Sequence, residues 1–85
     1  NFTLSQNYPN PTSDTTSIAV TLNNPDNINL KVISLTGQLV YEASKGNASI
    51  GTHKMDIDAS ILSSGVYFYT VSVGDKSITK KMIVD

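Results

Sequence analysis

Apolar and polar residues alternate along most of this chain, and residues typical of turns separate the alternating segments. A period of two places successive side chains on opposite faces of a β-strand, so each alternating segment predicts a strand with one buried face. Residues 65–73, with the sequence GVYFYTVSV, combine this pattern with the highest density of aromatic and β-branched residues. Such residues pack well on a pleated surface, which predicts a central position for this strand.

Six segments of this kind and a short N-terminal arm predict the strands of an all-β fold. In the arm, NFTLSQ, the side chains of Phe2 and Leu4 share one face. The longer strands are predicted at residues 15–22, 28–32, 38–44, 52–58, 65–73 and 77–84, with turns or loose connections at 23–27, 45–51 and 74–76. Short, evenly spaced strands without a helix predict a seven-strand antiparallel β-sandwich of the Ig-like or fibronectin III-like class.

Three interruptions of the alternation also predict structure. Ile33 and Leu35 break the phase, so the strand that contains residues 28–32 is expected to end or to bulge there. Residues 59–64 are too few and too rich in serine for an α-helix, and we expect at most one 3₁₀ turn. Gly65 follows where the chain must turn sharply into the central strand. We therefore expect a positive φ at Gly65, and both backbone strain and steric crowding if valine replaced it.

The inward faces of the predicted strands define a small core. We expect residues 1–85 to form one sandwich domain, which would hide only a little over ~60% of its unfolded surface. A slip of one residue would turn a strand inside out, so the burial of Tyr67 and Tyr69 tests the register of the central strand. The predicted core residues are Ile18, Val20, Leu22, Leu30, Val32, Val40, Met55, Ile57, Tyr67, Tyr69 and Val71.

The composition argues against several classes of function. The net charge of −1 provides no basic field for nucleic acid. The chain has no cysteine, which excludes a disulfide framework and a thiolate metal site. The apolar runs are too short to span a membrane, so we expect no direct membrane insertion. The sequence opens at Asn1 rather than at a methionine, and we interpret it as a piece of a longer protein.

The candidate catalytic and metal-binding residues lie together in residues 52–58. His53 is the only histidine, and strand geometry places its side chain on the face opposite Asp56 and Asp58. A hydrolytic triad would therefore need partners that the sequence does not indicate, and we predict no catalysis at His53. Asp56 and Asp58 share a face ~7 Å apart, but they lack the flexible glycine-containing turn of a calcium loop. We interpret them as solvated charges.

The aromatic residues and the lysine pair near the chain end also have plain structural interpretations. A sugar-binding platform would present exposed planar aromatic rings, but the chain has no tryptophan, and Tyr67 and Tyr69 share a face with core residues. Lys80 and Lys81 point to alternate faces of the last predicted strand. Lysines on an edge strand hinder unwanted strand pairing.

Taken in order, the motifs of the chain resemble those of one known family. They are F-x-L-x-x-N-Y-P-N-P (2–11), T-x-I-x-V-x-L (16–22), L-x-V-x-x-L-x-G-Q-x-V (30–40), G-x-H-x-M-D-I (51–57), L-S-S-G-V-Y-F-Y (62–69) and K-K-M-I-V (80–84). The ordered set resembles the C-terminal sorting domain (type A) of the type IX, or Por, secretion system of Bacteroidetes-type bacteria. The chain departs from many relatives at Thr12, where they carry a phenylalanine after the second proline.

The resemblance implies a folded address rather than an enzyme, with no cofactor. Such a domain follows a secreted cargo, passes through the periplasm to the cell surface or medium, and has the outer-membrane translocon and a sortase-like protease as its partners. By this resemblance, the segment recognised by the machinery is predicted to comprise Lys80, Lys81, Met82, Ile83 and Val84. The residues expected to maintain the fold are Tyr8, Pro9, Asn10, Pro11, Gly37, Gly65 and Tyr67.

The stretch QNYPNP (6–11) has an expected structural role. Its two prolines favour extended geometry in the residues before them, so we predict a stiff corner that lays Tyr8 and Phe2 across the open end of the sandwich. Two other functions stay open at this point. The chain could be an Ig-like structural spacer or adhesive module of a secreted multidomain protein, or a carbohydrate-binding module.

Overall fold

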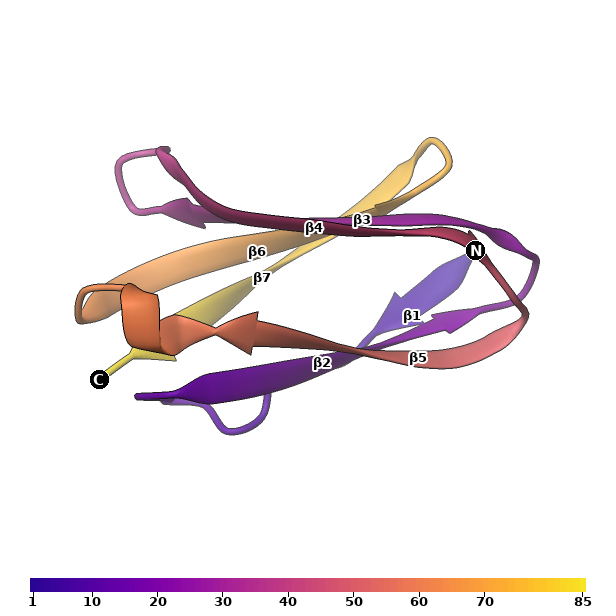
Figure 1. Cartoon of the computed structure of the whole chain (residues 1–85). Coiled ribbons are helices and arrows are strands. Elements are labelled where there is room, and N and C mark those ends of the chain that lie inside the picture. Colours follow the sequence, from indigo (N-terminus) through magenta and orange to yellow (C-terminus); the bar gives the residue numbers. More distant parts are fainter.

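Two antiparallel sheets stack face to face in the computed structural model, which describes residues 1–85 (Figure 1). The smaller sheet has the order β1-β2-β5, and the larger has the order β4-β3-β6-β7. The strands are β1 (Phe2–Leu4), β2 (Thr15–Leu22), β3 (Asp26–Ser34), β4 (Leu39–Ala48), β5 (Gly51–Asp58), β6 (Gly65–Val73) and β7 (Lys76–Val84), and one 3₁₀ helix, η1 (Ala59–Ile61), lies between β5 and β6. The predicted all-β, seven-strand antiparallel sandwich is confirmed, and so is the single 3₁₀ turn.

The strand order differs from that of a constant-type immunoglobulin domain. In a constant-type immunoglobulin domain the fourth strand belongs to the sheet of the first, second and fifth strands. Here β4 pairs with β3 in the larger sheet instead. One of the two central strands of that sheet is β6, which pairs with β3 on one side and β7 on the other, as its composition predicted.

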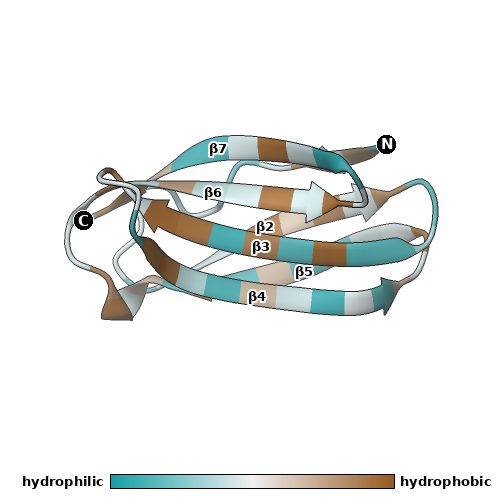
Figure 2. Ribbon diagram, turned by 90° about the horizontal axis from the view of Figure 1, so that it is seen from above, coloured by the Kyte–Doolittle hydropathy of each residue, from teal (hydrophilic) through white to brown (hydrophobic).

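The core lies between the two sheets, and alternate residues of each strand enter it. Figure 2 shows this alternation as hydrophobic and hydrophilic bands along the strands. Tyr67 and Tyr69 are both buried, so the predicted register of β6 is confirmed. Of the predicted core residues, Val40 and Met55 are only partly buried at the rim of the core. The remaining members of the core are Phe2, Leu4, Ile28, Ala48, Ala59, Val73, Met82 and Val84.

The largest error of the sequence prediction concerns residues 45–51. They were expected to form a loose connection, but β4 continues to Ala48 and β5 begins at Gly51. A register shift opposite β3 lets Ala48 pair with Asp26 and become buried, while Asn47 takes a positive φ of 52° and donates its N–H to Asn27 Oδ1. Glycine and asparagine therefore mark an irregularity within a strand pair here, and not a loop.

Two other irregularities were predicted correctly. The register between β3 and β4 shifts again between Val32 and Ile33, where the alternation breaks in the sequence. Gly65 has a φ of +152°, as expected, but no heavy atom lies within 4 Å of a Cβ placed there. The predicted steric crowding at Gly65 is therefore wrong, because the residue opens toward solvent. No helix in the structure is long and apolar enough to cross a membrane.

Candidate recognition site on the C-terminal strand

β7 contains the residues predicted for recognition, and it lies at an edge of the larger sheet. Its alternation divides them into two groups. Met82 and Val84 are buried in the core, where a partner cannot contact them while the domain is folded. Lys81 is exposed, and Lys80 and Ile83 are half-buried. The accessible part of the predicted segment therefore consists of three side chains.

Lys81 and Ile83 lie beside apolar residues on the solvent-facing side of the larger sheet. Phe68 pairs with Lys81, and Val66 pairs with Ile83, while Ile33 lies opposite Phe68 on the other side. All four apolar residues of this group are half-buried. We call Ile33, Val66, Phe68 and Ile83 the outer patch. It provides an apolar surface next to the exposed ammonium group of Lys81.

An N-terminal segment covers the main chain of β7 at its C-terminal half. We call residues 6–12 the edge segment. The Thr12 N–H donates to the Ile83 carbonyl at 2.9 Å, and the Asp85 N–H donates to the Thr12 carbonyl at 2.8 Å. Side-chain amides add two bonds, because Asn10 Oδ1 accepts from the Ile83 N–H at 3.0 Å and Gln6 Nε2 donates to the Lys81 carbonyl at 2.8 Å. Thr12 runs parallel to β7 and bridges to Val84.

The same segment is tied to the smaller sheet, so it joins the two sheets along one side of the sandwich. Tyr8 pairs with Ser17 of β2 through two backbone hydrogen bonds. Asn7 is buried, and its side-chain Nδ2 donates to Thr16 Oγ1 at 3.0 Å and to the Pro9 carbonyl at 3.2 Å. Thr16 Oγ1 in turn donates to the Pro9 carbonyl at 2.8 Å. Every buried side-chain nitrogen and oxygen atom of this corner has a hydrogen-bond partner.

The sequence prediction for QNYPNP is wrong in one respect. Phe2 is buried as expected. The side chain of Tyr8 is 82% exposed, so it does not cover the open end of the sandwich. Ser5 and Gln6 both face solvent, which shifts the alternation after Leu4 and gives the inward position to Asn7. The peptide bonds that precede Pro9 and Pro11 are both cis. The role of the stretch is to cover the edge of β7 with backbone and amide groups.

Thr12 and Thr16 contribute buried hydroxyl groups to this corner, and neither was selected from the sequence for such contacts. Thr12 is buried, and its hydroxyl oxygen lies 3.3 Å from the Asp14 N–H nitrogen and 3.2 Å from the Asp14 carbonyl. Thr16 is in phase with Ile18 and Val20, so its inward orientation was contained in the alternation. The partners of Asn7 and Thr16 could not be read from the pattern, because an amide at a strand end has many possible contacts.

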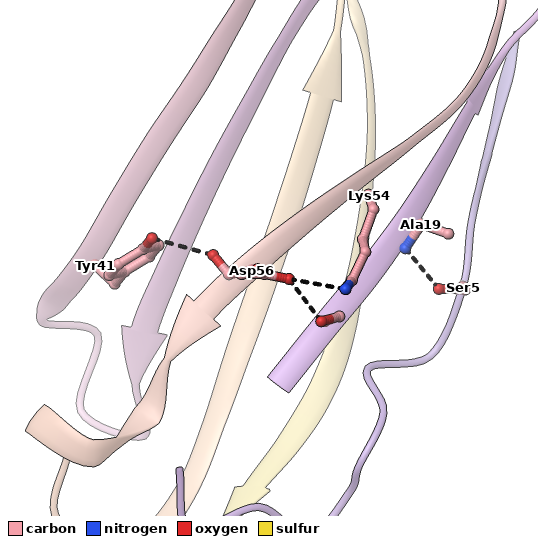
Figure 3. Close-up of polar contacts among 6 residues, drawn as sticks. Ser5, Ala19, Tyr41, Lys54 and Asp56 are labelled. Atoms are coloured by element: carbon pink, nitrogen blue, oxygen red, sulfur yellow. Dashed lines mark hydrogen bonds and ion pairs between the residues drawn. The ribbon is translucent and has the colours of Figure 1, made fainter. Parts of the chain in front are cut away.

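The acidic and histidine residues of β5 contact neighbouring loops and strands. His53 Nε2 lies 2.7 Å from the Ser49 carbonyl oxygen. Figure 3 shows Asp56 with its carboxylate near Lys54, at 3.8 Å, and its carbonyl accepting from the Tyr41 hydroxyl at 3.2 Å. Ser17 Oγ donates to the same carboxylate at 2.7 Å. Both members of the ion pair are exposed, so it contributes at most about 1 kcal/mol to stability.

Asp58 acts as the cap of η1. Its carboxylate accepts from the Ser60 N–H at 3.1 Å and from the Ser60 hydroxyl at 2.5 Å. The structure holds no group of three or more His, Asp and Glu residues arranged to hold a metal ion. Asp56 bonds to residues of β2 and β4, and Asp58 caps the 3₁₀ turn.

A groove lined by both polar and apolar residues lies at the end of the sandwich near the C-terminus. A hollow of 440 Å³ is lined by residues of the β3–β4 turn and of η1 and by Tyr67, and a second hollow of 280 Å³ shares Ser34 and Tyr67 with it. The exposed side chains of Leu35, Leu39 and Ile61 lie along these hollows. Sequence reasoning missed this groove because its two walls are far apart in the chain.

Tyr67 and Tyr69 do not present their rings as a surface for sugar binding. Tyr67 and Tyr69 are buried, and their hydroxyls donate to the Ser63 and Ser5 carbonyls at 2.7 and 3.0 Å. Burial raises the pKa of Tyr69 above its ordinary value of 10.0, and the hydrogen bond from the Asn7 N–H offsets part of this effect.

Comparison with known proteins identifies the family. A search of curated proteins found no significant match to the chain. The model of one protein family, described as the secretion system C-terminal sorting domain, matches residues 6–85 and therefore includes the edge segment, the whole of β7 and every strand between them. The chain belongs to this family, the C-terminal sorting domains that mark proteins for export by type IX secretion.

Proposed function

We propose that residues 1–85 form a non-catalytic address that directs a preceding cargo protein across the outer membrane, and that the secretion machinery recognises it at β7. The observation that carries this proposal is the family match over residues 6–85. The cargo passes through the periplasm and reaches the cell surface or the medium, where a sortase-like protease removes the domain. The translocon of the outer membrane and this protease are its partners.

Burial and hydrogen bonding limit which groups of the predicted segment a partner can contact. Met82 and Val84 hold β7 in the core, so they contribute to recognition only by positioning the strand. At the free edge, the Lys81 carbonyl and both main-chain groups of Ile83 are already bonded to the edge segment. Recognition at this half of β7 therefore depends on accessible side chains: Lys81 and Ile83 with the outer patch on the outward face, and the half-buried Lys80, which lies on the other face opposite Tyr69. A charge beside an apolar surface suits a specific protein contact.

The test is export of a periplasm-directed reporter that carries this domain at its C-terminus, in a cell with type IX machinery. Deletion of residues 80–85 is expected to leave the reporter in the periplasm. The deletion also removes Met82 and Val84 from the core of a domain whose stability is of the order of 5–15 kcal/mol, so it can act by unfolding. It tests whether the folded domain is needed, but not which residues are recognised.

The double substitution Lys80→Ala, Lys81→Ala tests recognition with less risk to the fold. The matched control is Lys31→Ala, Lys45→Ala, which removes two exposed lysines from other strands of the same sheet. We expect export to fall with the first pair and to persist with the second, with thermal melts close to that of the unchanged domain. Normal export of the first pair would contradict recognition at these lysines. Normal export of the deleted fusion would contradict the sorting function itself and favour a structural spacer.

A further inference from the structure

The edge segment covers only half of the free edge of β7. Main-chain groups of alternate residues bond to the edge segment: the Lys81 carbonyl, the Ile83 N–H and carbonyl, and the Asp85 N–H. Alternate residues of β7 therefore direct their main-chain groups away from β6. The same alternation directs the N–H and carbonyl groups of Ser77 and Thr79 to the free edge. No strand lies beyond β7 in the sheet, and no turn or loop hydrogen bond reaches these two residues. Their peptide groups are open to an added strand.

Charge is concentrated on this strand. β7 contains Lys76, Lys80 and Lys81, which are three of the six basic residues of a chain with a net charge of −1. It contains no acidic residue. Lys76 and Lys81 are exposed, and Lys80 is half-buried. Two copies of such an edge would bring like charges together, whereas an extended segment with acidic side chains would meet charges of opposite sign.

Resting on the proposed sorting function, we propose that residues 76–80 accept one added β-strand from the secretion machinery, an extended segment that carries acidic side chains. The edge segment then acts as a stop, because its bonds to Lys81, Ile83 and Asp85 occupy the positions where pairing would continue. The open half spans about 17 Å at the usual rise per residue, which fits a strand of about five residues. The backbone pairing provides affinity, and the lysines select the partner by charge.

The first test removes one open donor. Thr79→Pro deletes an N–H that faces away from β6, and proline is tolerated at such positions of edge strands. Thr79→Ala is the matched control, since both changes remove the hydroxyl that lies 2.8 Å from Thr70 Oγ1, but only proline removes the N–H. In the reporter assay we expect export to fall about tenfold or more with Thr79→Pro and to persist with Thr79→Ala.

The second test does not depend on how the fold tolerates proline. Lys76→Glu, Lys80→Glu reverses the charge of the open half, and Lys31→Glu, Lys45→Glu is the control on β3 and β4, which do not pair with β7. We expect a loss of export of about tenfold or more with the first pair alone, because rim charges control the encounter with a charged partner. Normal export of both Thr79→Pro and the charge-reversed β7 variant would overturn strand addition while leaving the sorting function intact.

Two further outcomes separate this proposal from its alternatives. If Lys76→Ala, Lys80→Ala makes the purified domain self-associate in sedimentation while export stays normal, the lysines only prevent pairing between copies, and the proposal is overturned. If the unchanged domain fails to export the reporter at all, the proposed sorting function fails first, and strand addition fails with it.

Discussion

The hydroxyl of Tyr69 accepts a hydrogen bond of 2.9 Å from the backbone N–H of Asn7, which lies 62 residues earlier in the chain. The same hydroxyl donates to the Ser5 carbonyl at 3.0 Å. Tyr69 is fully buried at the centre of β6, so these bonds tie the edge segment to the core. The segment that covers β7 is therefore held in place by the central strand, and the covering of β7 depends on the packing of the whole domain.

Tyr69→Phe is expected to lower the free energy of unfolding by about 1–3 kcal/mol. The change keeps the ring but leaves the buried Asn7 N–H without a partner, and such a group costs its desolvation. Urea denaturation measures the change. Tyr41→Phe is the control, because its hydroxyl makes an exposed bond of 3.2 Å and its loss is expected to cost less. Equal effects of the two substitutions would contradict the anchoring role of Tyr69.

Stability is expected to fall as the pH rises above about 10. Burial raises the pKa of Tyr69 above 10.0 in the folded domain, so its neutral form is favoured there. Above pH 10 the unfolded chain releases this proton first, and the free energy of unfolding declines as the pH rises toward the folded pKa. Urea titrations between pH 7 and about 11.5 should show a shallower decline for Tyr69→Phe than for the unchanged domain. Parallel declines would show that other groups cause the effect.

Gly65→Ala and Gly65→Val are both expected to destabilise the domain by about 1–3 kcal/mol, because a φ of +152° is strained for residues with a Cβ. No heavy atom lies within 4 Å of the added Cβ, so the two substitutions should differ little. Gly46→Ala, without a positive φ in this range and with its nearest atom at 3.8 Å, is the matched control. Thermal melts measure all three. A much larger loss for valine than for alanine would point to crowding.

Gln6→Ala, Asn10→Ala is expected to expose the edge of β7 without unfolding the domain. The two amides bond the Lys81 carbonyl and the Ile83 N–H, and these contacts are exposed bonds with a typical contribution of about 0.5–1.5 kcal/mol each. Amide hydrogen exchange should show faster exchange at Ile83. The neighbouring Met82 amide, which faces β6, serves as an internal control and should keep its protection. Unchanged exchange at Ile83 would show that the backbone contacts of Thr12 suffice.

The period-two pattern by itself determined the class of fold and most of the core. Ile18, Val20 and Leu22 are buried as their alternation required, and so are Tyr67 and Tyr69. This part of the prediction succeeds because the alternation of a strand is local, and burial of one face follows from it directly. The ordered motifs also predicted the family, which the match over residues 6–85 confirms.

Only the tertiary structure decided what happens at the edges of the sheets. The exposure of Tyr8, the burial of Asn7 and the continuation of β4 to Ala48 depend on contacts between segments that are distant in the chain. The division of β7 into a covered and an open half has the same origin, since the bridge between Thr12 and Val84 joins residues near opposite ends of the sequence. The alternation in a sequence specifies which face of a strand is buried. It does not specify which neighbour pairs with its backbone, because every peptide group presents the same donor and acceptor.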